Sequence, residues 1–484
     1  MPNKSKAGRS NKREQSESSK KLVEEIVAAL RHEVRERLGP NSTFEQRRDA
    51  GFEIMRDVLW KDGDDDLQES ITDADEVDVD GKRYGRLKQS SSARYTGRFG
   101  PHYVEEPLYR ELGVHNGPTI KPIELRMGII EHMTPDMARV VGALSAERGS
   151  RALERTLRIV GHVPPSRAFL ADRITAMGAK IADVAADLES DARAAEIVSE
   201  EVASVSCGLD RMSVRMNEVI EGNSVPPRTR TEPYQRTPPL PSEHHYRMAW
   251  VGSTSTYDVQ GKELHTWRVA MEADADRDKL ADRVAADVAW IVHTHPGVPV
   301  HCIQDAGPEL RALPEALTRV LPAETVPVVL VDFEHLMGYL DEVVDTCEPD
   351  GDPRDMKGWY RSKLLQDDGA IDRIQRTLRD KAKRLPGRNT AARKSVAAAL
   401  RYIKLRKDKM RYASLYEANL PIGSGATEST CWQMQQRVKL PGQSWEPHGL
   451  RGVLAIRGLV LSERWDTAWP SFAAEHRANV RAVA

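Results

Sequence analysis

Residues 202–216, VASVSCGLDRMSVRM, hold the pattern that decides the fold. From Val202 and Val205 to Met216, apolar and polar residues alternate in the manner of a β-strand. Further elements follow in the order strand, strand, helix, strand, helix, strand. The segments behind this expectation are residues 246–256, 264–271, 276–287, 298–303 and 327–331. The order predicts a mixed α/β core that begins near residue 200.

Three acidic residues stand where a strand or a turn of this core meets the next element. Asp210 lies inside the first strand, Asp305 follows a strand, and Glu428 ends PIGSGATE, a glycine-rich turn that opens a helix. In a chain with 73 acidic residues, an Asp taken alone is more often a helix cap or a solvated side chain. Phosphoryl transfer in DNA uses two divalent metal ions about 3.5–4 Å apart. Mg²⁺ and Mn²⁺ prefer carboxylate ligands, so the three acids are candidate ligands for two such ions.

The C-terminal part of the chain carries a long composite motif. It comprises MRYASLYEANLPIGSGATEST at 410–430, LRGVLAIRGLVLSERWDTAW at 450–469, and between them the set Arg437, Lys439, Pro441-Gly442 and Trp445. This stretch resembles the C-terminal region of the ISKra family of bacterial insertion-sequence transposases. SCGLDRMSVRMNE, QDAGPELRAL and LVDFEHLMGYL resemble the family's segments around its first acid, its second acid and an Asp-x-x-His element. Weaker similarity extends back to about residue 81.

The resemblance implies a DDE transposase with an α/β ribonuclease-H-like core, a helical insertion and, before them, an all-α DNA-binding region. It implies catalysis by Asp210, Asp305 and Glu428, with Asp332 and His335 as accessory residues. The implied substrates are double-stranded DNA, as terminal inverted repeats and as target, bound by a homodimer or larger assembly. For Asp332 and His335, a packed histidine hydrogen-bonded at a strand end is the alternative interpretation.

The sequence departs from the family's pattern at three places. Arg211 and Ala306 follow the first and second acids, where relatives often carry Gly. Residues 94–112 lack the small cysteine motif that many relatives carry before the helical domain. None of these departures removes a catalytic acid. A catalytically inactive DNA-binding protein derived from a transposase therefore stands as one alternative function.

The region before the core has mostly helical periodicity. Residues 19–38 and 43–59 predict helices, residues 61–80 an acidic loop, and residues 134–180 three helices interrupted by glycine and proline. The last three are compatible with a helix-turn-helix. Arg167 and Arg173 on the third of them are candidate DNA contacts, against the alternative of a structural bundle.

Positive charge is concentrated near the end of a helical stretch. Residues 379–411 contain thirteen Lys or Arg against two Asp, which indicates either a contact with a polyanion or a solvated helix face. The candidate DNA contacts nearest Glu428, with two more from the C-terminal motif, are Lys404, Arg406, Lys407, Lys409, Arg411, Arg437 and Lys439.

The composition limits the class of protein and the cellular compartment that we expect. No apolar run approaches the roughly 18 residues of a membrane span, and the N-terminus lacks the apolar segment of a secretory signal. None of the four cysteines lies in a closely spaced pair, which favours a protein of the reducing cytoplasm. For a transposase, the expected location within the cytoplasm is the nucleoid. We divide the chain into seven parts. The first four are a disordered basic tail (1–20), a helical region with an acidic loop (21–80), a small β or irregular segment (81–133) and a helix-turn-helix-like domain (134–198). The catalytic core (199–350), a basic helical insertion (351–412) and the helices that carry the Glu (413–484) follow.

A different function is suggested by His293-Thr294-His295-Pro296, which is similar to the His-x-His-Pro of JAMM zinc metalloproteases. Two histidines and one carboxylate can hold a catalytic zinc ion. That family places a Ser and an Asp at positions that Ile303 and Ala306 occupy here. The metalloprotease is therefore the weaker alternative.

Overall fold

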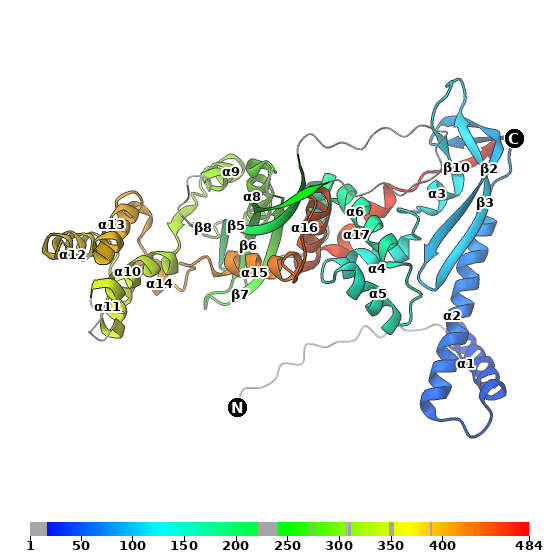
Figure 1. Ribbon diagram of the computed structural model, residues 1–484, viewed down its shortest axis with the longest axis horizontal. Coiled ribbons are helices and arrows are strands. Elements are labelled where there is room, and N and C mark those ends of the chain that lie inside the picture. The colour runs from blue at the N-terminus through cyan, green and yellow to red at the C-terminus, as the bar shows by residue number, and fades with distance from the viewer. Residues whose placement is uncertain are drawn as a thin grey trace. The chain divides into compact units, whose positions relative to one another are not determined.

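The computed structural model describes residues 17–220, 241–272, 275–305, 307, 311–347, 353–387 and 390–483. The chain forms two compact units (Figure 1). Unit 1 comprises Met1–Thr134, Leu157–Pro164 and Ala478–Ala484, and unit 2 comprises Pro135–Thr156 and Pro165–Arg477. The predicted disordered tail lies outside the described residues up to residue 16; residues 17–20 belong to a helix.

Two helices of unit 1, α1 (Glu17–Leu38) and α2 (Phe44–Glu69), pack against each other. A capping box starts α2: the backbone N–H of Gln46 donates to the Thr43 hydroxyl, and the Thr43 N–H donates to the Gln46 side chain. The acidic loop predicted for 61–80 is wrong over its first half. The helix runs on to Glu69 because Leu67, 2% exposed, is buried in the core of the unit.

Unit 1 also contains a five-stranded antiparallel sheet in the order β10-β1-β2-β3-β4. The segment 81–133, predicted as small β or irregular, contains strands and one short helix, whereas an all-α N-terminal region is wrong. The expectation that the chain ends in catalytic helices is also wrong for its last residues, because they form β10 beside β1. The elements are β1 (Glu76–Val79), β2 (Lys82–Gly97), β3 (Gly100–Glu111), β4 (Thr119–Ile120), α3 (Pro122–Met127) and β10 (Val480–Val483).

Unit 2 is built on a second sheet, in the order β7-β6-β5-β8-β9. β5, β6 and β7 are antiparallel neighbours, and β8 and β9 run parallel to β5. The predicted order of strands and helices is confirmed. The elements are β5 (Ser204–Val219), β6 (Ser242–Tyr257), β7 (Glu263–Met271), α8 (Arg277–Thr294), β8 (Val300–Gln304), α9 (Ala312–Val320) and β9 (Val328–Val331).

Helices cover both faces of this sheet. Leu209 of β5 faces α8, because its partner Gly252 lies against Val284. Gly208, which directly precedes Leu209 on β5, points to the opposite face, toward α15 (Gly425–Val438). α16 (Pro447–Leu461) packs beside α15 on β7.

The helices α4 (Pro135–Ser145), α5 (Ser150–Ile159), α6 (Arg167–Asp183) and α7 (Ala185–Ala195) confirm the helical prediction for 134–180. They do not form a separate domain, since α4, α6, α7 and most of α5 belong to unit 2. α6 packs tightly on α16 where Gly178 meets Gly452, and a Cβ on Gly178 would stand 2.9 Å from the Gly452 Cα. α7 packs on α17 (Trp465–Ala474).

A helical subdomain separates β9 from α15, as predicted, but it starts earlier than residue 351. Val331 and Phe333 already belong to its apolar cluster, so α10 packs with the insertion rather than with the sheet. Its elements are α10 (Phe333–Cys347), α11 (Pro353–Gln366), α12 (Ala370–Arg384), α13 (Thr390–Lys404), the 3-10 turn η2 (Lys407–Lys409) and α14 (Ala413–Glu417).

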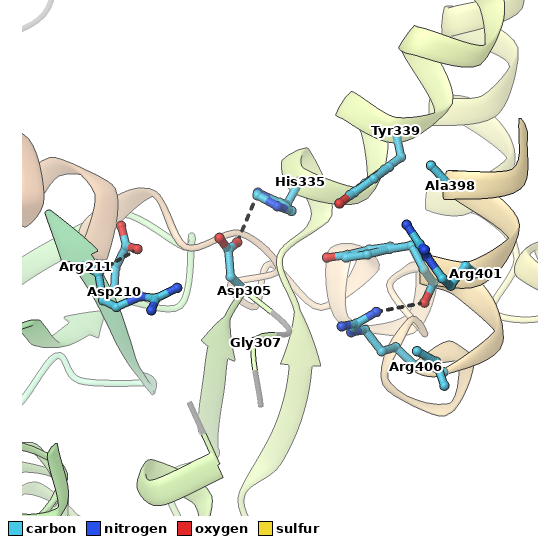
Figure 2. Close-up of a pocket in the computed structure, with 11 residues that line it drawn as sticks. Asp210, Arg211, Asp305, Gly307, His335, Tyr339, Ala398, Arg401 and Arg406 are labelled. Carbon is cyan, nitrogen blue, oxygen red and sulfur yellow. Dashed lines mark hydrogen bonds and ion pairs between the residues drawn. The ribbon is translucent and has the colours of Figure 1, made fainter. Parts of the chain in front are cut away.

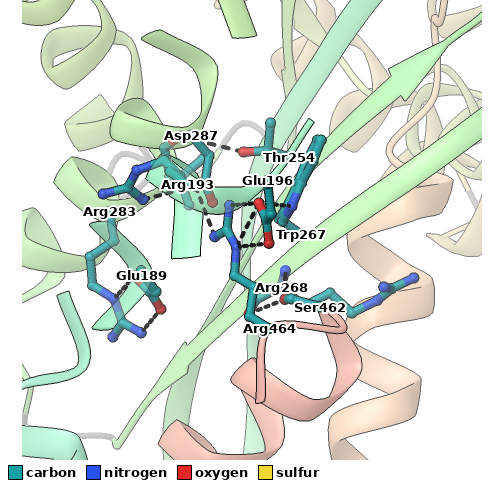
Figure 3. A network of polar contacts seen from close by, with 11 residues as sticks. Glu189, Arg193, Glu196, Thr254, Trp267, Arg268, Arg283, Asp287, Ser462 and Arg464 are labelled. Atoms are coloured by element: carbon teal, nitrogen blue, oxygen red, sulfur yellow. Dashed lines mark hydrogen bonds and ion pairs between the residues drawn. The ribbon is translucent and has the colours of Figure 1, made fainter. Parts of the chain in front are cut away.

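A buried ionic network links α7, α8 and α17 next to Trp267 of β7 (Figure 3). The guanidinium of Arg464, 1% exposed, donates to Asp287 at 2.9 Å and to Glu196 at 2.9 Å. Arg193 donates to the same Asp287 oxygen at 2.9 Å, and the Trp267 indole donates to Glu196 at 3.2 Å. Removal of one partner would leave buried charge uncompensated, so the network locks these elements together.

No helix in the described parts of the chain combines the length and the apolar character that a membrane crossing requires.

Candidate active site

The strand register places the first two acids side by side. β5 and β8 are parallel neighbours that pair Val205 with Val300 and Cys207 with Cys302. Asp210 and Asp305 each lie three residues beyond the last of these pairs, at the same edge of the sheet. The carboxyl ends of parallel strands form the usual ligand-binding edge of such sheets.

Glu428 reaches this edge because α15 begins directly on the sheet. A Cβ on Gly208 would collide with the Ile303 carbonyl oxygen and stand 2.6 Å from the Thr427 hydroxyl, so only glycine permits the contact. The Thr427 hydroxyl is hydrogen-bonded to the Ser253 hydroxyl of β6 at 2.7 Å in a buried position. Glu428 follows in the first turn of α15, where the Ser424 hydroxyl donates to its Oε1 at 3.4 Å.

Asp332 ties three elements together rather than facing solvent. It directly follows β9, is 1% exposed, and accepts the backbone N–H of His335 at 2.5 Å. Its other oxygen accepts the backbone N–H of Ser424 at the start of α15. Asp332 therefore fixes the Glu428 helix relative to β9 and α10.

His335 contacts the second acid directly (Figure 2). Its Nδ1 lies 3.0 Å from Oδ1 of Asp305, and both side chains are about two-fifths exposed. The His335 ring lies 6.0 Å from each of the rings of Tyr339 and Tyr402, which stack on each other at 4.3 Å. This arrangement connects the acids to α10 and α13 of the helical subdomain.

The acids repel one another. Burial raises the pKa of Asp305, His335 opposes this shift, and the charges of Asp210, Asp332 and Glu428 reinforce it. Burial and the charges of Asp332 and Asp210 also raise the pKa of Glu428, against the Ser424 hydrogen bond and His335. A divalent cation would relieve this repulsion, and an all-carboxylate set suits Mg²⁺ or Mn²⁺. Within the described residues, no three His, Cys, Asp or Glu side chains converge closely enough to form a ready-made ligand group.

Cys431 is a site residue that the sequence did not reveal. One turn after Glu428 on α15, its thiol donates to Oδ2 of Asp210 at 3.2 Å. Burial and the neighbouring Asp210 raise the pKa of Cys431, so it stays a neutral thiol. Cys431 lies four residues after Thr427, so the two share the sheet-facing side of α15. This spacing is the signal by which the sequence could have revealed Cys431.

A cavity of about 360 Å³ opens beside the acids, between the sheet edge and α13 (Figure 2). Three cations, Arg211, Arg401 and Arg406, line it together with Asp210 and Asp305. The Arg406 guanidinium lies 4.6 Å from the Tyr402 ring centre. Arg401 lies within the basic block but was not among the five candidates named for DNA contact.

The five candidates of the basic block do not share one surface. Arg406 lines the cavity, whereas Lys407 and Arg411 line a separate hollow with Asp372 and Asp408. The Lys407 ammonium lies 3.1 Å from the Asp372 carboxylate. The two remaining candidates, Lys404 and Lys409, are exposed.

Arg437 does not fit its predicted role in DNA contact. It is 4% exposed, its Nε donates to the Ser145 carbonyl at 2.7 Å, and its guanidinium lies 4.9 Å from the Trp445 ring centre. Burial lowers its pKa to about 10. Arg437 thus fastens α15 to the end of α4, while Lys439, directly after α15, is exposed.

The two arginines of α6 differ in environment. Arg167, at the first position of the helix, is exposed. Arg173 is partly buried and its guanidinium lies 5.4 Å from the Phe169 ring centre. Their contact with DNA stays a prediction.

The His-x-His-Pro motif is separated from the acids by a whole strand. His293 and His295 lie at the end of α8, before β8 begins, and Asp305 follows the other end of β8. Five residues of strand span about 16 Å, at roughly 3.3 Å per residue. His301 does not bridge the gap, because it is fully buried and burial lowers its pKa to about 4. This separation argues against a zinc centre built from the motif and Asp305.

The sequence matches no protein-family model and no curated protein sequence.

Proposed function

We propose that this protein is a DDE-type transposase that cleaves DNA at the ends of an insertion sequence and joins them to target DNA. The observation that carries the proposal is the common edge on which Asp210, Asp305 and Glu428 stand. Strand register brings the first two together, and the Gly208 contact brings the helix of the third. The sheet order and the element order support a ribonuclease-H-like core.

In this proposal Asp210, Asp305 and Glu428 hold two Mg²⁺ or Mn²⁺ ions. When bound, these ions would lower the barrier by activating the attacking oxygen and stabilising the leaving oxygen. Cys431 orients the Asp210 carboxylate, and His335 orients the Asp305 carboxylate. Asp332 fixes the start of α15. Arg211, Arg401 and Arg406 bind the phosphates beside the acids.

The proposed substrates are the terminal inverted repeats and the target DNA, bound by a homodimer or larger assembly in the cytoplasm at the nucleoid. The test is incubation of the purified protein with a DNA fragment that carries its gene and the flanking sequence. With Mg²⁺ we expect strand breaks at the element's ends that leave 3′ hydroxyl groups. Sequence-specific binding without strand breaks would instead support a DNA-binding protein without chemistry.

A further inference from the structure

β5 and β6 continue as a two-stranded ribbon beyond the rest of their sheet. β8 pairs with β5 only up to Cys207, and β7 pairs with β6 only from Trp250 onward. β5 and β6 nevertheless stay paired to Val219 and Ser242. The Asp210 side chain points to one face of this ribbon and Arg211 to the other. The face of Arg211 is connected to the acids because Arg211 lines their cavity.

The ribbon is held by hydrogen bonds along the edge of β5 that does not pair with β6. The backbone N–H of Trp445 donates to the Arg215 carbonyl at 3.0 Å, and the Asn217 N–H donates to the Trp445 carbonyl at 2.7 Å. The Trp445 indole is itself anchored, since it donates to the Val438 carbonyl at the end of α15 at 2.9 Å. The segment after α15 thus braces the ribbon, and a ligand on it would cost little ordering of the backbone.

Charge is sorted between the two faces of the ribbon. Successive residues of a strand point to opposite faces, so the face of Arg211 also carries Ser213, Arg215 and Asn217 from β5. From β6 it carries their partners Trp250, Met248, Tyr246 and His244. This face has cations and aromatic rings and no acid between these positions. The opposite face carries Glu218, bound in a bidentate pair by Arg247 at 2.7 and 2.8 Å.

Large side chains stand exposed on the basic face. Tyr246 is 73% exposed and Met248 is 43% exposed. The Arg211 guanidinium lies 5.6 Å from the Trp250 ring centre, and Arg211 also lines the cavity of the acids. Proteins bind unpaired nucleic acid strands with cations placed along the phosphate backbone and with aromatic rings on which the bases stack.

We infer that this face of the ribbon, from Arg211 to Tyr246, binds an unpaired DNA strand that continues from the scissile phosphate. Arg211 and Arg215 contact its phosphates, and Tyr246 stacks on a base. The inference rests on the proposed function for the identity of the strand. The binding itself is independent of cleavage and is measured without it.

The experiment measures the affinity of the full-length protein for a labelled single-stranded oligonucleotide and for the matching duplex, by fluorescence anisotropy in EDTA. We expect Tyr246→Ala to weaken single-strand binding about tenfold, with duplex binding unchanged and Tyr246→Phe close to wild type. Arg215→Ala should flatten the plot of log affinity against log salt by about 0.7 for the single strand. The matched controls are Arg247→Ala on the opposite face and Tyr103→Ala, an exposed tyrosine of unit 1.

Three results would overturn the inference: no single-strand binding by the wild type, equal binding by Tyr246→Ala, or an equal loss with Arg247→Ala. A dimer that dissociates in Tyr246→Ala while single-strand binding per chain is unchanged would assign the face to a second copy instead. Ribbon-dependent binding by a protein that never cleaves DNA would refute the proposed function and leave this inference standing. If the protein cleaves DNA but its Tyr246→Ala variant binds the single strand normally, the proposed function stands and this inference is refuted.

Discussion

Gly208→Ala tests the contact that seats the Glu428 helix on the sheet. The added methyl group would collide with the Ile303 carbonyl and stand 2.6 Å from the Thr427 hydroxyl. The carbonyl belongs to β8, which is paired with β9 and cannot turn away. Thr427 can move only by giving up its buried hydrogen bond to Ser253.

The cost can be worked from these two contacts. Overpacking of a well-packed interior costs roughly 1–3 kcal/mol. Leaving the buried Ser253 hydroxyl without its partner costs roughly 1–3 kcal/mol more. We therefore expect Gly208→Ala to lower the free energy of unfolding by roughly 2–6 kcal/mol and to displace the start of α15. Any Mg²⁺-dependent DNA cleavage should fall with it, because Glu428 lies in that first turn.

Urea unfolding followed by circular dichroism measures the first effect. The control is Gly338→Ala in α10, where the new Cβ would meet nothing within 4 Å. That change should stabilise the protein by roughly 0.5–1 kcal/mol, because alanine favours a helix. Equal unfolding midpoints for Gly208→Ala and wild type would refute the tight seating of α15, whatever happens to activity.

Other consequences of the structure can be measured independently. Arg464→Ala should cost roughly 3–5 kcal/mol in urea unfolding because it removes a partner of the buried Asp287 and of the partly buried Glu196. Loss of the exposed Arg361–Glu334 ion pair should cost under about 1 kcal/mol, and equal costs would contradict the buried network. His301 has a pKa lowered to about 4, so its stabilising contribution is complete above about pH 6.5 and is lost as pH falls toward 4. His301→Leu should therefore remove roughly 2 kcal/mol of the stability lost between about pH 7.5 and 5, and an unchanged pH profile would refute this assignment. Arg401→Ala should flatten the salt dependence of duplex DNA binding by about 0.9, and Lys407→Ala, which removes the partner of Asp372, should flatten it less.

The sequence predicted the sheet of unit 2 well because its periodicity is local. Alternation around Asp210 and the apolar run before Asp332 mark strands without knowledge of their neighbours. The acidic segment after residue 60 was misjudged because its helix depends on burial of Leu67, a contact with residues distant in sequence. The pairing of the C-terminal strand with β1 spans almost the whole chain and leaves no local pattern.

The same distinction applies to the site. Asp305 and Glu428 stand out in the sequence through the family resemblance, because an acid after a strand or in a turn that opens a helix is common. Cys431 was not, since its bond to Asp210 depends on how α15 lies on the sheet. Arg437 is a candidate DNA contact in the sequence because it belongs to the C-terminal motif, and only its packing against Trp445 reveals its structural role.

The most direct test of the central claim compares the three acids in one assay. DNA carrying the element's ends is incubated with Mg²⁺ or EDTA and with wild type, Asp210→Asn, Asp305→Asn or Glu428→Gln. An acid that the site does not use, the exposed Asp282 on the α8 face of the sheet, provides the control Asp282→Asn. We predict Mg²⁺-dependent cleavage by wild type and the control, none by the three variants, and nearly unchanged end binding by all. Near wild-type cleavage by any of the three variants, or cleavage that persists in EDTA, would contradict the carboxylate site.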